Sequence, residues 1–373
     1  MFILTEDQVM IRDLARDLAD SKLKQYAANV DWTATYPAAS LQAMAEAGLM
    51  GTTIPEAYGG AELDAMAQAL VVEEAAKVCS STAALIAESG AVADAVARFG
   101  GDAVKGAVLP RLAEGTTASV AVSEGDADAS LTAVTATAVK NGSGYVLSGT
   151  KRYVLNAGNS DFYLVAAIVA DEGLTVFLTE KSNPGVKFGP LSPKMGQRAC
   201  VTGELLLDQC EVGQDAVIGQ VGGGEAVIAA VEDGLHLGSA AQAVGIAQGA
   251  MDTAVQYVNE RVQFGKRIAQ FQNSQQIMAF LHARIEAARM LLWSAAGERA
   301  AGLDCSARCS MAKVVAADLA NEVTRKCVQF MGGFGYSREY PAERMMRDAK
   351  MTELYGGAME TQKTRIAQSI GVM

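Results

Sequence analysis

The feature that most constrains the fold is a hydrophobic pattern that changes from helical to strand-like and back along 373 residues. Residues 1–116 carry apolar side chains at spacings of three and four, which is typical of amphipathic helices. Residues 117–221 are rich in strand-forming runs, and the pair Asn141-Gly142 predicts a hairpin turn between two of them. Residues 222–373 return to the helical spacing. We therefore expect an α+β protein of three domains, with ligand sites where they meet.

The last block contains four long segments in which apolar residues recur at helical spacing. They are Glu225–Val258, Asn273–Gly297, Ser306–Met331 and Pro341–Gln368. We expect each of them to be helical.

Composition excludes several classes of function. The net charge of −11 and the pI near 4.9 disfavour nucleic acid and anionic membranes as partners. The N-terminal segment has neither a basic region nor a long apolar run, so we expect no signal peptide. Six scattered cysteines favour free thiols in a reducing cytoplasm, where we place the protein. Because His236 and His282 are the only histidines, we expect neither a metal site nor a Ser-His triad.

Six motifs occur in a fixed order along the three blocks. They are Ile54-Pro-Glu-Ala-Tyr-Gly-Gly-Ala, Ser119-Val-Ala-Val-Ser-Glu, Lys194-Met-Gly-Gln-Arg-Ala-Cys, Arg261-Val-Gln-Phe-Gly-Lys-Arg-Ile-Ala-Gln-Phe-Gln, Gln329-Phe-Met-Gly-Gly-Phe-Gly-Tyr and Pro341-Ala-Glu-Arg-Met-Met-Arg-Asp-Ala-Lys. In this order the set resembles the acyl-CoA dehydrogenase family over essentially the whole chain. The resemblance implies an N-terminal helical domain, a central β-barrel-like domain and a C-terminal four-helix bundle.

The resemblance also implies FAD as the cofactor. The residues expected to contact it are Ser123, Tyr153, Leu155, Arg261, Phe264, Gln272, Gln329, Gly332, Gly333 and Gln362. Arg261 can offer a charged fork to the pyrophosphate, and the two glycines permit close backbone approach. Without the resemblance, Arg261 would be interpreted as a solvated charge at a helix end, and Gly332-Gly333 as a plain helix-terminating turn. In the family the last-block residues serve the FAD of a neighbouring subunit, which implies a homotetramer or a heterotetramer with a paralogue.

Members of the family remove an α-proton from an acyl thioester while a hydride leaves the β-carbon. The resemblance places Asp233, His236 and Tyr355 at the substrate, which is carried by CoA or an acyl-carrier protein, and suggests an electron-transferring flavoprotein as acceptor. The usual catalytic Glu follows a tyrosine, and here that position is Gly356. A subset of the family keeps its base at the position of Leu235. The N–H of residue 356 would still be available to polarise the thioester carbonyl.

Other substitutions weaken the expected FAD site. Ala129 and Leu155 replace residues that carry a hydroxyl in the family, and His236 replaces a common arginine. A relocated base is one answer, and Glu88 is the candidate, because a carboxyl on the predicted acyl-pocket helix would have a raised pKa. The alternative is a solvent-facing glutamate or one that sets substrate polarity.

Two more acidic residues, Asp126 and Asp128, lie near the expected flavin, although acidic residues are common in turns. Three functions therefore remain open. The first is a dehydrogenase with a relocated base. The second is a base-independent acyl-CoA flavoenzyme, as in the desulfinase branch, for which Arg98 is a poorly placed anion clamp. The third is a non-catalytic partner subunit in a heteromeric complex.

Overall fold

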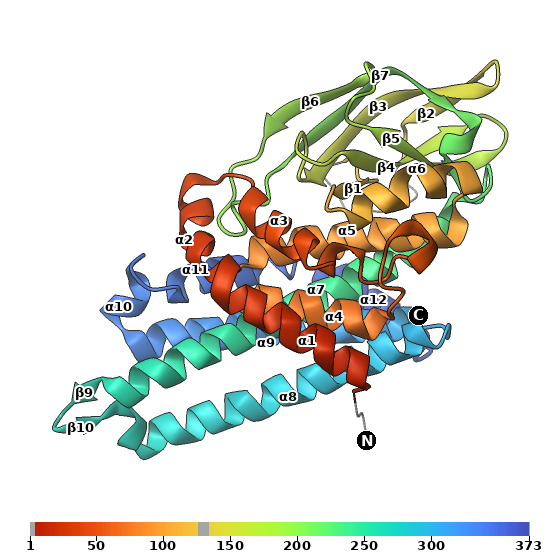
Figure 1. Cartoon of the computed structure of the whole chain (residues 1–373). Helices are drawn as coiled ribbons and strands as arrows, with labels where there is room; N and C mark the ends of the chain where they lie inside the picture. Colours follow the sequence, from red (N-terminus) through yellow and green to blue (C-terminus); the bar gives the residue numbers. More distant parts are fainter. Residues whose placement is uncertain (1–3, 126–133, 373) are drawn as a thin grey trace.

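The computed structural model describes residues 4–125 and 134–372, and it confirms the helical, β and helical order of the chain (Figure 1). The helices of the first block are α1 (Glu6–Leu18), the π-helical turn Ala19–Leu23, α2 (Lys24–Thr33), α3 (Ala38–Glu46), α4 (Ala65–Ala76), α5 (Ser80–Phe99) and α6 (Asp102–Ala113). Local side chains fix two of their starts. Thr5 and Gln8 form a reciprocal capping box at α1, and the Asp64 carboxylate accepts the Ala67 N–H at α4.

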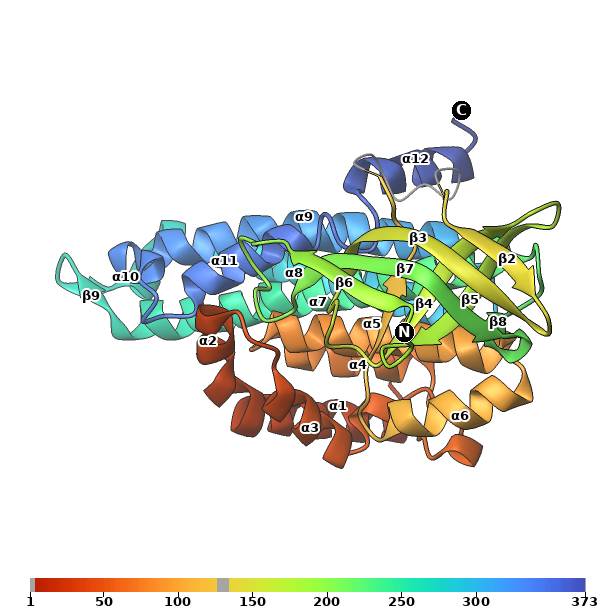
Figure 2. The same ribbon diagram turned by 90° about the horizontal axis from the view of Figure 1, so that it is seen from above.

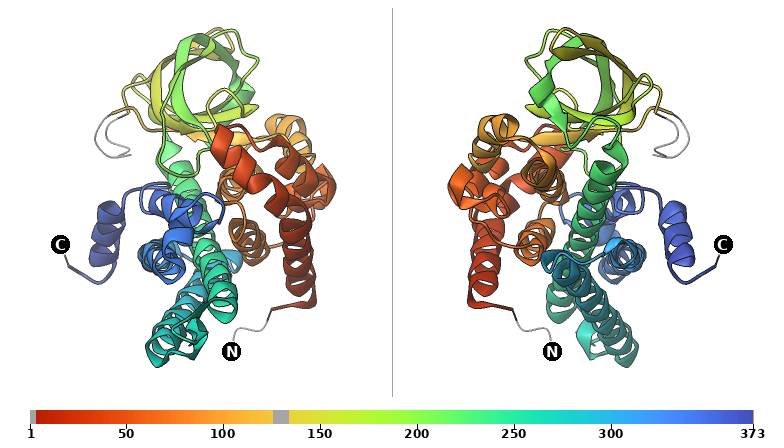
Figure 3. Two further views of the ribbon diagram at one scale, coloured as in Figure 1. Left: turned by 90° about the vertical axis from the view of Figure 1, so that its left-hand side faces the viewer. Right: turned by 90° about the vertical axis from the view of Figure 1, so that its right-hand side faces the viewer.

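The middle block forms one eight-stranded sheet within the described residues. Its strands are β1 (Ala118–Ala121), β2 (Thr137–Asn141), β3 (Gly144–Leu155), β4 (Phe162–Val169), β5 (Gly173–Glu180), β6 (Val186–Leu191), β7 (Thr202–Gly213) and β8 (Val217–Ile218). The strand order is β6-β7-β3-β2-β4-β5-β8, with β1 parallel to β4. The hairpin predicted at Asn141-Gly142 is confirmed as the β2–β3 turn. Seen end-on in Figure 3, the sheet curves into a barrel-like wall above the helices.

The last block holds the long helices that organise the rest of the molecule. Its elements are α7 (Gly224–Glu260), β9 (Val262–Gln263), β10 (Lys266–Arg267), α8 (Gln272–Ala300), α9 (Ser306–Met331), α10 (Gly333–Tyr336), α11 (Ala342–Met351) and α12 (Met359–Ser369). The helix α7 packs against α8 and α9 and also against α4 and α5 of the first block (Figure 2). Both helical blocks therefore share one core.

Small residues allow α7 to lie close to the first block. A Cβ built on Gly245 would stand 2.3 Å from the Glu73 carbonyl oxygen, and one on Gly238 would stand 2.7 Å from the Ala87 Cβ. Only glycine fits at such distances. The alanine- and glycine-rich sequence of α7 is thus a packing requirement of the α4–α5–α7 contact.

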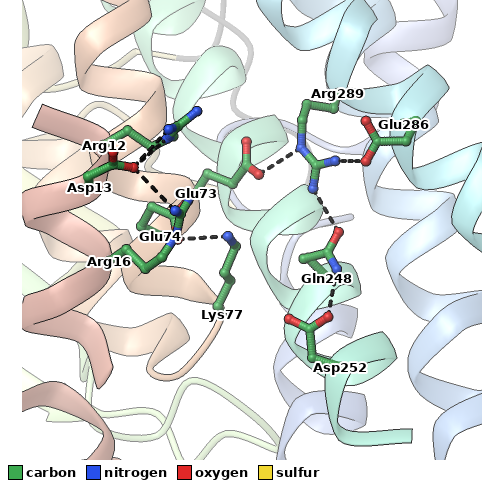
Figure 4. Close-up of polar contacts among 10 residues, drawn as sticks. All are labelled: Arg12, Asp13, Arg16, Glu73, Glu74, Lys77, Gln248, Asp252, Glu286 and Arg289. Atoms are coloured by element: carbon green, nitrogen blue, oxygen red, sulfur yellow. Dashed lines mark hydrogen bonds and ion pairs between the residues drawn. The ribbon is translucent and has the colours of Figure 1, made fainter. Parts of the chain in front are cut away.

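A polar network ties four of these helices together inside the core (Figure 4). The consecutive residues Glu73 and Glu74 on α4 are both buried. Glu73 accepts from Arg289 on α8 at 2.8 Å, whereas Glu74 pairs with Arg16 on α1 at 3.0 Å and with Lys77 at 2.7 Å. Buried carboxylates tolerate this environment only when they are paired, so each pair fixes how α1 and α8 lie on α4.

The prediction of one helical segment over Pro341–Gln368 is wrong. The structure has two helices, α11 and α12, joined by a turn that contains Gly356 and Gly357. Both glycines have positive φ angles, 71° and 103°, which interrupt a right-handed helix. This break falls in the segment for which the resemblance predicts the usual base.

Candidate active site

Apart from Gln362, the residues predicted to bind FAD separate into two groups, one around the β9–β10 turn and one beside the ends of β1 and β3 (Figure 1). At the β9–β10 end, Arg261, Gln329, Gly332 and Gly333 line a groove of about 530 Å³. Arg261 stacks over the ring of Phe334, with 5.5 Å between the guanidinium carbon and the ring centroid. Phe264 and Gln272 lie at the same end but are exposed and outside the groove lining.

This groove fits the pyrophosphate of FAD. A Cβ added at Gly332 or Gly333 would meet no atom within 4 Å, so the space over both backbones is open. Gly332 also has a φ of +59°, which few other residues adopt. An open glycine backbone beside the Arg261 guanidinium is a donor set suited to an anionic phosphate.

The second group lies where β1 and β3 end against the helical core. Ser123 follows β1, and its carbonyl accepts the Arg152 N–H at 2.7 Å. Tyr153 has a φ of +57° at an irregularity of the β3–β7 pairing and is 58% exposed, while Leu155 is buried. The predicted residues Asp126, Asp128 and Ala129 lie outside the described residues.

Gln362 belongs to neither of these two groups. It is buried on α12, where its amide oxygen accepts a hydrogen bond from the Ser310 hydroxyl at 2.8 Å. It stands next to the Gly357 backbone, within 2.6 Å of a Cβ built there. Gln362 therefore supports the turn between α11 and α12 from within the protein.

Gly356 and Leu235, the two positions at which the resemblance to the family predicts a base, are neighbours in space. A Cβ built on Gly356 would lie 3.3 Å from the Leu235 carbonyl oxygen and 3.4 Å from the Leu235 Cβ. Leu235 lies on α7, and Gly356 lies in the turn before α12. Side chains from either position would therefore reach the same place, which in this chain is bordered by leucine and glycine.

Glu88 is inside the protein, so the expectation of a solvent-facing glutamate is wrong. Its side chain is 2% exposed on α5. One carboxyl oxygen accepts the Val120 N–H at 2.7 Å, and the other accepts the Tyr355 hydroxyl at 3.0 Å. Burial raises the pKa of Glu88 to about 8. The two hydrogen bonds lower this pKa, but they offset only part of the effect of burial. The structure thus joins Glu88 to the residue directly before Gly356.

Asp233 and His236 face different surroundings. Asp233 accepts a hydrogen bond from Ser306 at 2.8 Å and lines a cavity of about 680 Å³ among α4, α5, α7, the end of α8 and the loop that follows it. His236 is buried and faces the backbone of Gly356 and Gly357. Burial holds the pKa of His236 well below its usual value, so the ring is neutral. Within the described residues, its Nδ1 has no hydrogen-bond partner.

One residue of this region is missing from the sequence-based set. Lys313 on α9 is completely buried, and its ammonium group donates to the carbonyl oxygens of Tyr355 and Gly357. In the sequence, Lys313 stands among small apolar residues such as Ala312 and Ala316 on one face of a predicted helix. A lysine in such a pattern is unusual, and this signal could have identified it. Its partners could not be found, because they are backbone atoms of a distant turn.

The described residues contain no cluster of three or more side chains able to hold a metal ion. Among the same residues, no helix combines the length and apolar character needed to cross a bilayer.

Comparisons with known proteins agree with this architecture. The chain matches the acyl-CoA dehydrogenase N-terminal domain over residues 5–116, the middle domain over 119–210 and the C-terminal domain over 228–371. It is 36% identical to a short-chain specific acyl-CoA dehydrogenase of Clostridium acetobutylicum, over 99% of both chains. It is 35% identical to an acryloyl-CoA reductase (NADH) of Anaerotignum propionicum, over 99% of this chain and 95% of the relative.

Among solved structures, butyryl-CoA dehydrogenase from Megasphaera elsdenii superposes with a TM-score of 0.96, at 34% identity and over 99% of both chains. The family matches span nearly the whole chain, and the helical, β and helical layout is shared. The chain therefore belongs to the acyl-CoA dehydrogenase family, whose members are FAD-dependent flavoenzymes.

Proposed function

We propose that this chain is an oxidoreductase acting at the α- and β-carbons of an acyl-CoA, with Gly356 in place of the usual base and Glu88 as the proton acceptor. The observation that supports this proposal is the hydrogen bond between the Tyr355 hydroxyl and the Glu88 carboxylate, at 3.0 Å. It connects a buried carboxyl to the turn in which the base of the family is expected. Proximity of a carboxyl to the reacting carbon is the first requirement of a general base.

The chain's own residues would hold FAD from two sides. Arg261, with Gly332 and Gly333, would take the pyrophosphate at the groove of the β9–β10 end. Ser123 and Leu155 would line the ring system where β1 and β3 end. When bound, FAD supplies the acceptor for the hydride that leaves the β-carbon.

The α-proton would pass to Glu88. Burial raises the pKa of this carboxyl to about 8, so the ionised fraction grows as the pH approaches that value. Burial also raises the pKa of Tyr355 well above its usual value, so its hydroxyl stays protonated and keeps Glu88 oriented. Glu88 is shielded from water, and Tyr355 is partly buried beside it.

Two arrangements follow for partners. One group of predicted FAD-binding residues lies at the β9–β10 turn, and the other lies beside β1 and β3 (Figure 1). This separation favours a site that is completed by a second copy in a homotetramer, or by a paralogue in a heterotetramer. The reduced flavin needs an electron acceptor, and the resemblance suggests an electron-transferring flavoprotein for this role. Sedimentation of the purified protein, alone and with added acceptor flavoprotein, would measure both assemblies.

One observation favours the second candidate function, a base-independent acyl-CoA flavoenzyme. Leu235 and Gly356 make the shared base position apolar. In that case the bond to a β-leaving group would break with its electrons going to that group, and the α-proton would pass to water rather than to a carboxylate. The third candidate, a non-catalytic partner subunit, would purify without flavin unless a paralogue is co-expressed.

The test is the visible spectrum of the purified protein, followed by anaerobic addition of a panel of acyl-CoAs. We expect a flavin band that bleaches with substrate in the wild type and persists in Glu88→Gln. Asp94→Asn is the matched control, because Asp94 lies on the same helix but pairs with Arg299 at 2.5 Å. A Glu88→Gln variant that bleaches like the wild type would remove Glu88 from the mechanism, and a wild-type band that never bleaches would favour the base-independent function.

A second pair of variants examines the vacant base position. Gly356→Glu would return a carboxyl there, and Gly356→Gln would add the same bulk without the charge. Both variants have to accept a φ of +71° and a Cβ close to Leu235, so they share the same strain. A gain of activity in Gly356→Glu alone indicates that the rest of the site is intact, whereas equal loss in both indicates that the pocket has diverged.

A further inference from the structure

The turn between α11 and α12 is held by a buried cation. Lys313 has no exposed surface, and its Nζ donates to two carbonyl oxygens of this turn, those of Tyr355 and Gly357. The other lysine without exposed surface, Lys151, donates to the Glu124 carboxylate. In the described part of the chain Lys313 has no such direct ion pair, and the groups its ammonium contacts are backbone carbonyls. A buried cation without a carboxylate is costly and asks for an explanation.

The peptide unit that joins Tyr355 to Gly356 offers an explanation for this buried cation. Its carbonyl oxygen accepts from Lys313, and its N–H is that of Gly356. This N–H makes no backbone hydrogen bond within the described residues. A cation on the carbonyl draws electron density from the peptide and makes the N–H at its other end a stronger donor, because hydrogen bonds in a chain polarise one another.

The groups around Lys313 shape its charge without neutralising it. Arg365 repels its protonated form and Glu232 attracts it, but these two residues pair with each other at 2.5 Å. His236, across the same turn, is neutral. Burial lowers the pKa of Lys313 to about 7, so a negative charge placed at the turn would favour the protonated lysine.

We propose that Lys313 is a positioning residue whose charge polarises the Tyr355–Gly356 peptide, so that the Gly356 N–H binds the thioester carbonyl oxygen as negative charge develops on it. This inference rests on the proposed function, which places an acyl-CoA at the turn. Donors aimed at a developing oxyanion are effective when they are fixed in advance and shielded from water. The two carbonyl contacts fix the turn, and the buried charge strengthens its free donor.

The experiment measures the donor directly. Butyryl-CoA labelled with ¹³C at its carbonyl is bound to the FAD-loaded protein, and the infrared frequency of the labelled carbonyl is compared with that in water. We expect a shift to lower frequency in the wild type. Lys313→Met, which removes charge and donors, and Lys313→Gln, which keeps a donor but no charge, should both lose most of this shift. Catalytic turnover, where measurable, should fall by about 10-fold or more in both.

The outcomes separate three explanations. A Lys313→Gln variant with the full wild-type shift would overturn the inference, since a hydrogen-bonding scaffold would then suffice without charge. If Lys313 variants do not fold, the wild type alone decides: the carbonyl shift should weaken at a pH above about 7, because bound acyl-CoA favours the protonated lysine, and a shift that stays constant up to about pH 10 would overturn the inference. Absence of calorimetric butyryl-CoA binding by the wild type would instead contradict the proposed function.

Discussion

Replacing Glu88 by glutamine should change how the stability of the protein depends on pH. The side chain is buried on α5, and burial raises the pKa of its carboxyl from 4.5 to about 8. Glutamine has nearly the same shape but no titratable group. Because every other ionisable group is shared, the difference between the two proteins reports on this one carboxyl.

The sign and size follow from linkage. The folded protein binds the proton of Glu88 more tightly than the unfolded chain does. The stabilisation that this gives is fully present below a pH of about 4.5 and is lost as the pH rises through about 8. A difference of this size in pKa corresponds to a few kcal/mol, roughly 5 as an upper estimate.

The assay is urea unfolding of FAD-loaded wild type and Glu88→Gln at one protein concentration, from pH 5 to pH 9, in half-unit steps. Fixing the concentration matters because assembly contributes to apparent stability. The unfolding free energy of the wild type should fall relative to that of the variant between about pH 5 and pH 8. A difference that stays constant over this range would refute the reasoning, since Glu88 would then have an ordinary pKa in the folded protein.

Three further changes test the other parts of the structure. Arg289→Met should cost about 3–5 kcal/mol in urea unfolding, because it leaves the buried Glu73 carboxylate unpaired, while the double variant with Glu73→Met should recover most of the loss. Arg261→Ala should weaken FAD binding by about 1.5–3 kcal/mol, measured from flavin fluorescence on dilution, and Arg261→Lys should recover only part; unchanged affinity in both would place the pyrophosphate elsewhere. Gly356→Ala should cost about 1–2 kcal/mol, seen as a lower unfolding midpoint, because alanine must adopt a φ of +71°; an unchanged midpoint would mean that the turn can relax.

Much of the architecture could be predicted from the sequence. The change of apolar spacing near residues 117 and 222 predicts the block order, and α7, α8 and α9 follow the predicted segments closely. The spacing of apolar residues depends only on neighbouring positions along the chain, so it can be read directly from the sequence. The break before α12 was missed because the helical spacing continues on both sides of Gly356-Gly357, and two glycines alone do not decide between a helix and a turn.

The site was predicted in part. The motifs singled out Arg261, Gln329, Gly332 and Gly333 as cofactor-binding candidates, and these four residues line one groove. It also singled out Glu88, but it favoured a solvent-facing position, which is wrong because the side chain is buried. The spacing of one helix cannot tell which face meets β1 and which meets solvent.

By itself, then, the sequence determined the fold class, the family and the absence of a carboxyl at positions 235 and 356. Tertiary structure alone decided that these two positions meet and that Glu88 accepts a hydrogen bond from the Tyr355 hydroxyl. It also decided that Lys313 donates hydrogen bonds to the turn beside them. The reason is physical. A side chain's charge and strength as a base depend on burial and on partners, and those partners come from chain segments more than 40 residues away, some of them backbone atoms that carry no sequence signature.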